Sequence, residues 1–360
     1  MSKSLILSKS LILRSAAVFG AAALLLAGCQ PAPEPGETGD ASDFCARMVT
    51  NSGGLEDRSF NQASWAGLQD AADEFGIDAN VIVSTSEVDL APNVEEAVNT
   101  GCQFILTVGY ELAVATDENA VANPDVDFAI VDEFVDQPNV KPIVFDTAQA
   151  AFLAGYLAAG VSQTGKVATF GGGNQPPVTL FMDGFVDGVA KYNEVHGTAI
   201  VALGWDKAAQ DGVFTGDFED INKGLTTTQG FIDQGADVIL PVAGQVGEGS
   251  ARAALESGKA LVIWVDSDGY DTLSAEYRPV QLTSVLKNTG DAVVEIVQSS
   301  IDGTFDSTPY IGTLENGGVA IAPFHDTASR VSAELAAEIE QLKADIIAGT
   351  IEITSPSTPQ

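Results

Sequence analysis

The chain has 360 residues, of which 45% are hydrophobic, so it has enough apolar side chains to form a sizeable globular body. Its 50 acidic residues outnumber its 16 Lys and Arg residues and give a formal net charge of −34. Such a charge repels nucleic acid, so we exclude a nucleic-acid partner and interpret the acidity as a solvated surface.

The first 28 residues have the pattern of a signal peptide. Basic residues precede the apolar run Ala16–Ala27, which is too short to span a bilayer as a stable helix. The run ends at Leu26-Ala27-Gly28-Cys29, where small residues precede a thiol in the order typical of the lipobox of bacterial lipoproteins. We predict a signal peptide at 1–28 and an acyl anchor, such as palmitate, on Cys29. The alternative is an ordinary signal peptide with an incidental Cys.

Residues 29–43 are predicted to form a flexible tether. The segment is rich in Pro, Gly and acidic residues and has no aromatic residue, so it cannot bury enough surface to order itself. No second long apolar stretch follows Cys29, so the chain cannot itself be a permease. We therefore expect an extracytoplasmic protein, on the cell surface or in the periplasm, anchored to the cell membrane by lipid.

Beyond the tether, short β-rich runs alternate with helical stretches, which is typical of βα units and a parallel sheet. The first helix is predicted at Gln62–Phe75, where apolar residues recur on one face and Gly76 ends the pattern. Further helices are predicted at Gln149–Ser162, Asp291–Ser300 and Glu334–Ala348. Strands are predicted at Ala46–Asn51, Asn80–Ser84, Phe104–Val108, Asp127–Val131, Pro142–Phe145, Lys166–Phe170, Ala199–Leu203, Asp237–Val242 and Leu261–Val265.

These strands exceed one compact sheet, so the α/β chain is expected to form two doubly wound lobes. The apolar helix Gln149–Ser162 leads from the first lobe into the second. A return is expected near Asp266–Arg278, because Gln281–Val285 again predicts a strand. The expected ranges are 44–147 plus 267–312 for lobe 1, 148–266 plus 313–353 for lobe 2, and a disordered tail at 354–360.

Two cysteines remain after the acylation site. Cys45 begins the first predicted strand and Cys102 lies just before the third. In a doubly wound sheet with strand order 2-1-3 these strands are parallel neighbours, so both thiols lie at the same edge. We predict a structural Cys45–Cys102 disulfide, which an exported protein can retain; the alternative is two buried free thiols.

Candidate binding residues gather where the predicted strands end, since ligands of open α/β sheets bind beyond the carboxyl ends of the strands. These segments offer aromatic rings, neutral hydrogen-bonding groups and carboxylates, with hardly any Lys or Arg. Such a set suits a polyhydroxylated, aromatic, uncharged ligand. The segments are 57–61, 109–111, 132–133, 171–174, 205–206, 244–245 and 266–268.

Enzymatic chemistry has little support in the sequence. The chain has two His residues, no G-x-S-x-G elbow, and no phosphate-binding glycine loop. Nucleophilic triads and most metal sites need His or Cys. We predict no catalytic residues, no metal site and no cofactor.

The segment Asp57–Leu68 (DRSFNQASWAGL) closely resembles the D-x-S-F-N-x-x-x-x-x-G signature of the basic membrane protein family. These are substrate-binding lipoproteins of ABC importers and include purine nucleoside receptors. The similarity continues through Gly109-Tyr110, Val131-Asp132, Phe145–Ala159, Asp183–Phe185, Phe218–Asp220, Pro241–Gly249, Val265–Asp268 and Ser284–Asn288. The resemblance implies a type I periplasmic-binding-protein fold, in which two lobes joined by a multi-crossing hinge close on a nucleoside.

The resemblance also implies roles for individual residues. Phe60 and Phe218 would stack on opposite faces of a nucleobase, and Asp57 and Asn61 would hydrogen-bond its edge. The ribose would contact the remaining four: Asp132 and Asp266 would accept from hydroxyls, Lys287 would donate, and Gly244 would let the backbone approach the sugar. The implied protein is a monomer that delivers its ligand to an ABC permease and ATPase.

Each of these residues also has an ordinary structural interpretation. Phe60 could be a hydrophobic staple and Asn61 a helix N-cap. Asp132 and Asp266 could be helix caps or loop residues, and Gly244 could serve only a turn. Phe218 could be a core residue, and Lys287 could be a solvated helix residue. Two other functions stay open: a nucleoside-processing enzyme on the same fold class, and a surface lipoprotein that senses a sugar or another nucleoside-like solute.

Overall fold

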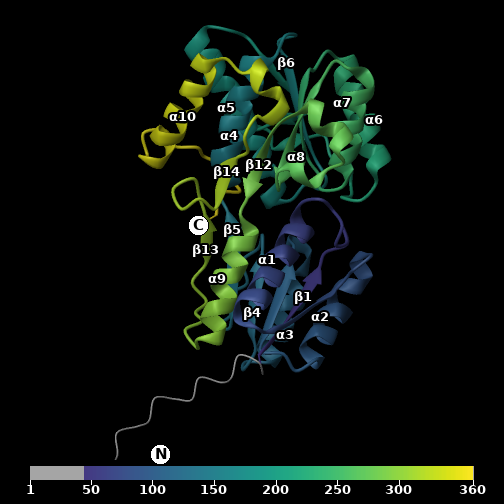
Figure 1. The fold of residues 1–360 in the computed structure, drawn as a ribbon, viewed down its shortest axis with the longest axis vertical. Helices are drawn as coiled ribbons and strands as arrows, with labels where there is room; N and C mark the ends of the chain where they lie inside the picture. Colours follow the sequence, from purple (N-terminus) through teal and green to yellow (C-terminus); the bar gives the residue numbers. More distant parts are fainter. Residues whose placement is uncertain (1–43, 360) are drawn as a thin grey trace, which may run out of the picture. The chain divides into compact units, whose positions relative to one another are not determined.

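The computed structural model describes residues 44–359 (Figure 1). The predicted signal peptide at 1–28, the tether at 29–43 and the acylation site Cys29 therefore lie outside the described residues. The described residues form two α/β lobes, each built on a six-stranded sheet, which confirms the predicted doubly wound architecture. None of the described helices is long and apolar enough to cross a membrane.

The sheet of the first lobe is entirely parallel, with the strand order β13-β5-β4-β3-β1-β2. Strand β1 lies between β2 and β3, as predicted for the first three strands. The strands are β1 (Cys45–Thr50), β2 (Asp78–Ile82), β3 (Phe104–Val108), β4 (Asp127–Val131), β5 (Val140–Phe145) and β13 (Tyr310–Gly312).

Helices cover both faces of this first sheet, so β3 is buried along its whole length. Successive side chains of a strand point to opposite faces. Phe104 and Leu106 accordingly join the cluster that contains Leu68 of α1, whereas Ile105 joins Val94 of α2. Helix α1 packs against α9, and α2 against α3. The helices are α1 (Phe60–Phe75), α2 (Leu90–Asn99), α3 (Ala113–Ala122) and α9 (Thr289–Ile301), with short 3₁₀ turns at Glu87–Asp89 and Tyr110–Leu112.

The sheet of the second lobe has the order β14-β12-β11-β10-β6-β7, with β14 antiparallel to β12. In Figure 1, α4, α5 and α10 lie to one side of β6, and α6 and α7 lie to the other. The strands are β6 (Lys166–Gly171), β7 (Val201–Leu203), β10 (Val238–Val242), β11 (Leu261–Asp266), β12 (Gln281–Lys287) and β14 (Val319–Ile321). The helices are α4 (Thr147–Val161), α5 (Pro176–His196), α6 (Ile221–Asp233), α7 (Val246–Ser257), α8 (Gly269–Thr272) and α10 (Ala333–Ile347). The remaining elements are a small hairpin of β8 (Trp205–Asp206) and β9 (Asp211–Gly212), and 3₁₀ turns at Ala275–Val280 and His325–Arg330.

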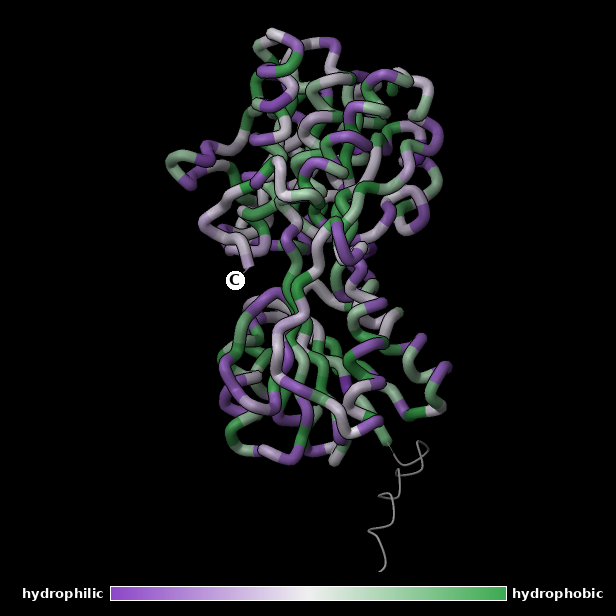
Figure 2. Tube along the Cα trace, turned by 90° about the vertical axis from the view of Figure 1, so that its left-hand side faces the viewer, coloured by the Kyte–Doolittle hydropathy of each residue, from purple (hydrophilic) through white to green (hydrophobic). Residues whose placement is uncertain are grey.

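The chain passes between the lobes three times: from β5 to α4, from β12 to α9, and from β13 to β14. The return expected near Asp266–Arg278 is wrong, because β12 pairs in parallel with β11 and so extends the second sheet. Sheet pairing therefore assigns 267–287 to lobe 2, not to lobe 1, and the return falls between Lys287 and Thr289. Figure 2 shows hydrophobic segments running through the interior of each lobe.

The tail expected to be disordered at 354–360 is ordered over the part that the structure describes. Ser355 Oγ donates to Asp183 Oδ2 at 2.6 Å, and the hydroxyls of Thr179 and Ser357 are 2.9 Å apart. The Pro- and Ser-rich composition of this segment favours disorder when taken alone. Hydrogen bonds to α5 order it instead, which corrects the prediction.

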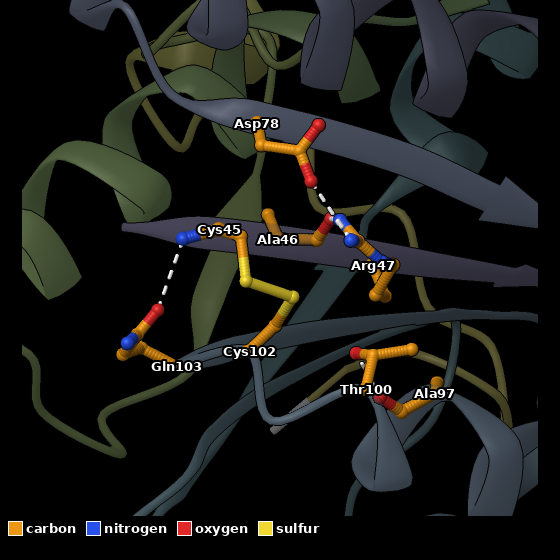
Figure 3. The surroundings of a disulfide bond; sticks show 8 residues. All are labelled: Cys45, Ala46, Arg47, Asp78, Ala97, Thr100, Cys102 and Gln103. Carbon is orange, nitrogen blue, oxygen red and sulfur yellow. Dashed lines mark hydrogen bonds and ion pairs between the residues drawn. A yellow bond between two sulfur atoms is a disulfide. The ribbon is translucent and has the colours of Figure 1, made fainter. Parts of the chain in front are cut away.

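The Cys45–Cys102 disulfide is present, as predicted (Figure 3). The two Cα atoms are 4.9 Å apart, and the bond joins positions 57 residues apart in sequence. Figure 3 shows the bond beside the ion pair of Arg47 with Asp78, 2.8 Å long. The bridge therefore fastens the start of β1 to the segment that leads into β3.

Candidate functional site

A cavity lies between the two lobes, at the carboxyl ends of their strands. The first lobe contributes residues that follow β1, β3 and β4, and the second contributes residues at the ends of β10, β11 and β12. This is where the strand-end rule predicts a ligand site. The residues that the sequence singled out and that line the cavity are Asp57, Phe60, Asp132, Phe218, Gly244, Asp266 and Lys287.

A buried charge cluster occupies one part of the cavity wall. Lys287 is the last residue of β12, and its Nζ donates to Asp132 Oδ2 at 2.5 Å. The same Nζ is 3.8 Å from Asp266 Oδ1, too far for a good hydrogen bond. The three side chains are at most 10% exposed. Lys287 is therefore a paired buried lysine, not a solvated one, and Asp266 retains acceptor capacity.

Asp132 and Asp266 occupy corresponding places in the two lobes. Asp132 directly follows β4, and Asp266 ends β11. Both have left-handed backbone, with φ of 70° and 65°. Neither caps a helix, since the cap of α8 is Asp268. Strained backbone of this kind costs roughly 1–3 kcal/mol and clusters at functional sites.

Burial raises the pKa of Asp266 to about 6. The neighbouring carboxylates of Asp132 and Asp57 raise this pKa further, while the Lys287 ammonium opposes the rise. Asp266 is therefore mostly an ionised acceptor at neutral pH and becomes a neutral donor in mild acid. The protonation state of Asp266 therefore depends on the charge and the hydrogen-bonding groups of a ligand in the cavity.

The Asp57 carboxylate caps the start of helix α1, whose N-cap position is Ser59. The ordinary structural interpretation of the sequence assigned this capping role to Asn61. The carboxylate of Asp57 accepts from the backbone N–H groups of Ser59, Asn61 and Gln62 at 2.7–3.1 Å. Burial raises the pKa of Asp57, and these hydrogen bonds oppose the rise. Asn61 lies behind the cavity wall, and its Nδ2 donates to Asn51 Oδ1 at 2.7 Å. Asn61 thus orients Asn51, which does line the cavity.

One aromatic ring from each lobe lines the cavity. Phe60 begins α1 in the first lobe, and Phe218 lies just before α6 in the second. Phe218 needs the glycine at 172, because a Cβ there would lie 2.4 Å from its ring carbon Cε1. Gly244 has a φ of 52° and passes close to the backbone of Phe218. The Lys287 ammonium lies 5.0 Å from the centre of the Phe60 ring, within cation–π range.

Some lining residues were not predicted, among them Asn51, Gln175 and Phe181. Asn51 directly follows β1, so the strand-end rule could have found it. Phe181 lies within α5, where a buried Phe has the pattern of an ordinary core residue. Gln175 precedes α5, and its Nε2 donates to Glu111 Oε1 at 2.8 Å. This hydrogen bond connects the two lobes at the cavity.

Residues 45–357 match the family described as ABC transporter substrate-binding protein PnrA-like. One relative is the ABC transporter nucleoside-binding protein BmpA of Lactococcus lactis subsp. cremoris, 31% identical over 94% of this chain and 97% of its own. Another is the CD4+ T-cell-stimulating antigen of Listeria monocytogenes, 31% identical over 87% of this chain and 88% of its own.

Solved structures support the same fold. A solute-binding protein of an ABC transporter system from Aeropyrum pernix K1 matches with a TM-score of 0.78. It is 23% identical, and the match covers 88% of this chain and 94% of that chain. This likeness confirms the predicted type I periplasmic-binding-protein fold.

Proposed function

Because this chain belongs to the PnrA-like family of ABC transporter substrate-binding proteins, we propose that its ligand is a nucleoside, with purine nucleosides preferred. The nucleoside is held in the cavity between the lobes. The closed protein then delivers it to an ABC permease that is coupled to an ATPase. The protein acts as a binding protein, not as an enzyme.

The observation that supports this ligand class is that the cavity combines aromatic rings with a buried cluster of charged side chains. Its walls include one aromatic ring from each lobe, Phe60 and Phe218, and a base can stack on such rings whatever its identity. Its buried charge cluster offers carboxylate acceptors at Asp132 and Asp266 and an ammonium donor at Lys287. Charged acceptors bind sugar hydroxyls more strongly than neutral ones do.

Two further roles complete the proposed site. Asp57 lines the cavity and is assigned to the base edge. Asn61 lies behind the wall, so its proposed contribution to the base edge is to orient Asn51, to which its Nδ2 donates at 2.7 Å. Gly244 gives the sugar close access to backbone, since its left-handed φ suits a residue without a side chain.

The proposed setting is the outer side of the cell membrane, with a monomer held by acylated Cys29. The lipobox pattern supports this proposal. A Cys29→Ser variant tests it by detergent phase partition. We expect the native protein in the detergent phase and the variant in the aqueous phase; equal partition of both would refute the anchor.

Binding is tested by thermal shift and calorimetry with nucleosides, free bases and sugars. A ligand at 100 times its dissociation constant stabilises the folded state by about 2.7 kcal/mol. We expect nucleosides to stabilise, bases and sugars to act weakly, and Phe60→Ala to lose affinity. Phe305→Ala, a partly buried phenylalanine outside the cavity, is the matched control.

Chromatography of the mixture after incubation separates binding from catalysis. Intact adenosine supports a binding protein, whereas release of adenine would support the enzyme alternative. No response to any nucleoside would refute the proposed ligand.

A further inference from the structure

A second cavity adjoins the first. Asp132 and Pro177 line both cavities, so the two meet beside the buried charge cluster. The second cavity also lies between the lobes. Its walls come from the ends of β4 and β5, the start of α5, and the segment 356–359.

The segment 354–359, here called the C-terminal strap, contributes residues 356–359 to the lining of this second cavity. Its attachments are to the second lobe. Lys207 Nζ donates to the carbonyl oxygen of Thr354 at 2.5 Å, and Ser355 Oγ donates to Asp183 Oδ2 at 2.6 Å. Asp183 is fully buried and also accepts from Trp205 Nε1 at 2.7 Å. The strap is therefore a fixed wall.

The lining of the second cavity is apolar with acidic residues on one side. Phe134, Val144, Phe145 and Leu180 supply apolar surface, while Asp132 and Glu133 supply carboxylates. None of the described residues that line it is Lys or Arg. An uncharged, apolar group is favoured there, because burial removes apolar surface from water. A phosphate would meet Glu133, which forms no ion pair within residues 44–359, and Asp132, whose carboxylate already engages the Lys287 ammonium.

We propose that this second cavity is a subsite for a substituent on the sugar end of the ligand, and that the strap forms its outer wall. The inference rests on the proposed function, since the ligand must place its sugar at Asp132, Asp266 and Lys287. The substrate class is then nucleosides that have an uncharged substituent on the 5′ carbon, together with unsubstituted nucleosides. Nucleoside monophosphates are excluded.

The position of the substituent follows from the chemistry of ribose. Its vicinal 2′ and 3′ hydroxyls suit a pair of carboxylate acceptors, so they are held at Asp132 and Asp266. The base extends from the opposite side of the ring toward Phe60 and Phe218. The 5′ carbon is the only remaining arm of the sugar, and it is free to project past Asp132 into the second cavity.

Calorimetry with adenosine, 5′-deoxy-5′-methylthioadenosine, 5′-deoxy-5′-butylthioadenosine and AMP tests the subsite in the full chain. We expect both thioethers to bind within about tenfold of adenosine, and AMP to bind at least about 100-fold more weakly. Adenosine binding without thioether binding would overturn the subsite but leave the proposed function. If the native chain does not bind adenosine, both the subsite and the proposed function are overturned.

Two strap variants, Pro359→Trp and Thr358→Trp, place bulk in the second cavity from a residue that does not line the first. We expect each to weaken butylthioadenosine binding by at least about tenfold and to leave adenosine binding within about twofold. Circular dichroism and the melting temperature verify folding. Unchanged butylthioadenosine affinity in both folded variants would overturn the role of the strap.

Discussion

Replacing Asp266 with Asn should make the ligand-free protein more stable and bind its ligand less well. Asp266 is 8% exposed, and its Oδ1 is 3.8 Å from the nearest cation. Its ionised form is therefore poorly compensated in the folded state. Asn has nearly the same shape, tolerates left-handed backbone, and mimics the neutral acid.

The size of the effect follows from the pKa of Asp266, which burial raises from 3.8 to about 6. A rise of this size means that ionisation of Asp266 costs the folded state about 3 kcal/mol relative to the unfolded chain. The cost is fully present above pH 6, where both states are ionised. The cost declines as the pH falls from 6 to 3.8, because Asp266 is protonated in the folded state before it is protonated in the unfolded chain. Below pH 3.8 both states are protonated and the cost is absent.

Urea unfolding at pH 8 and at pH 4 measures this difference. We expect Asp266→Asn to raise the free energy of unfolding by up to about 3 kcal/mol at pH 8 and by little at pH 4. Asp271→Asn, at an exposed position, should change stability at neither pH. Asp132→Asn should destabilise by about 3–5 kcal/mol, because it leaves the buried Lys287 without its close partner. A destabilised Asp266→Asn protein at pH 8, or a gain that does not shrink with acid, would refute this reasoning.

Three further perturbations have defined outcomes. Removing the disulfide by Cys45→Ala with Cys102→Ala should lower the free energy of unfolding by about 4 kcal/mol, given the 57-residue separation; a urea midpoint equal to that of the native protein would contradict a structural bridge. Phe218→Ala should weaken nucleoside binding by about 1–3 kcal/mol in calorimetry, and unchanged affinity would remove Phe218 from the site. Gln175→Ala removes the hydrogen bond to Glu111 between the lobes, so ligand dissociation followed by stopped-flow fluorescence should be about fivefold faster; an unchanged rate would show that this bond does not hold the closed form.

The strands of the first lobe could be predicted closely because each combines a short buried run with flanking turns. Phe104–Val108 and Asp127–Val131 have the predicted bounds. The partner of β12 could not be predicted in the same way. The alternation of side chains in a segment identifies it as a strand. Which strand it pairs with depends on how distant segments pack, and here β12 pairs in parallel with β11.

The candidate site was predictable where it obeys the geometry of parallel sheets. Asp132 follows the buried strand β4 and Asp266 ends the buried strand β11, so both lie at the same edge as the cavity. Phe181 and Gln175 reach the cavity from α5 and the turn before it, a helix that the strand-end rule does not consider. The capping role of Asp57 depends on a compact turn at Arg58, whose φ of 63° leaves no mark in the sequence pattern.

Because the chain passes between the lobes three times, neither lobe has all of its strands and helices until late in the sequence. This affects when each lobe can finish folding. The first sheet gains its edge strand β13 and its covering helix α9 only from residues 289–312. Helices α1 and α9 pack together across roughly 200 residues of sequence, and such distant contacts form slowly. The N-terminal part of the body therefore cannot finish folding until most of the chain has been synthesised. If a polypeptide of this topology crosses a membrane before it folds, its first lobe stays incomplete until residues 289–312 have also crossed.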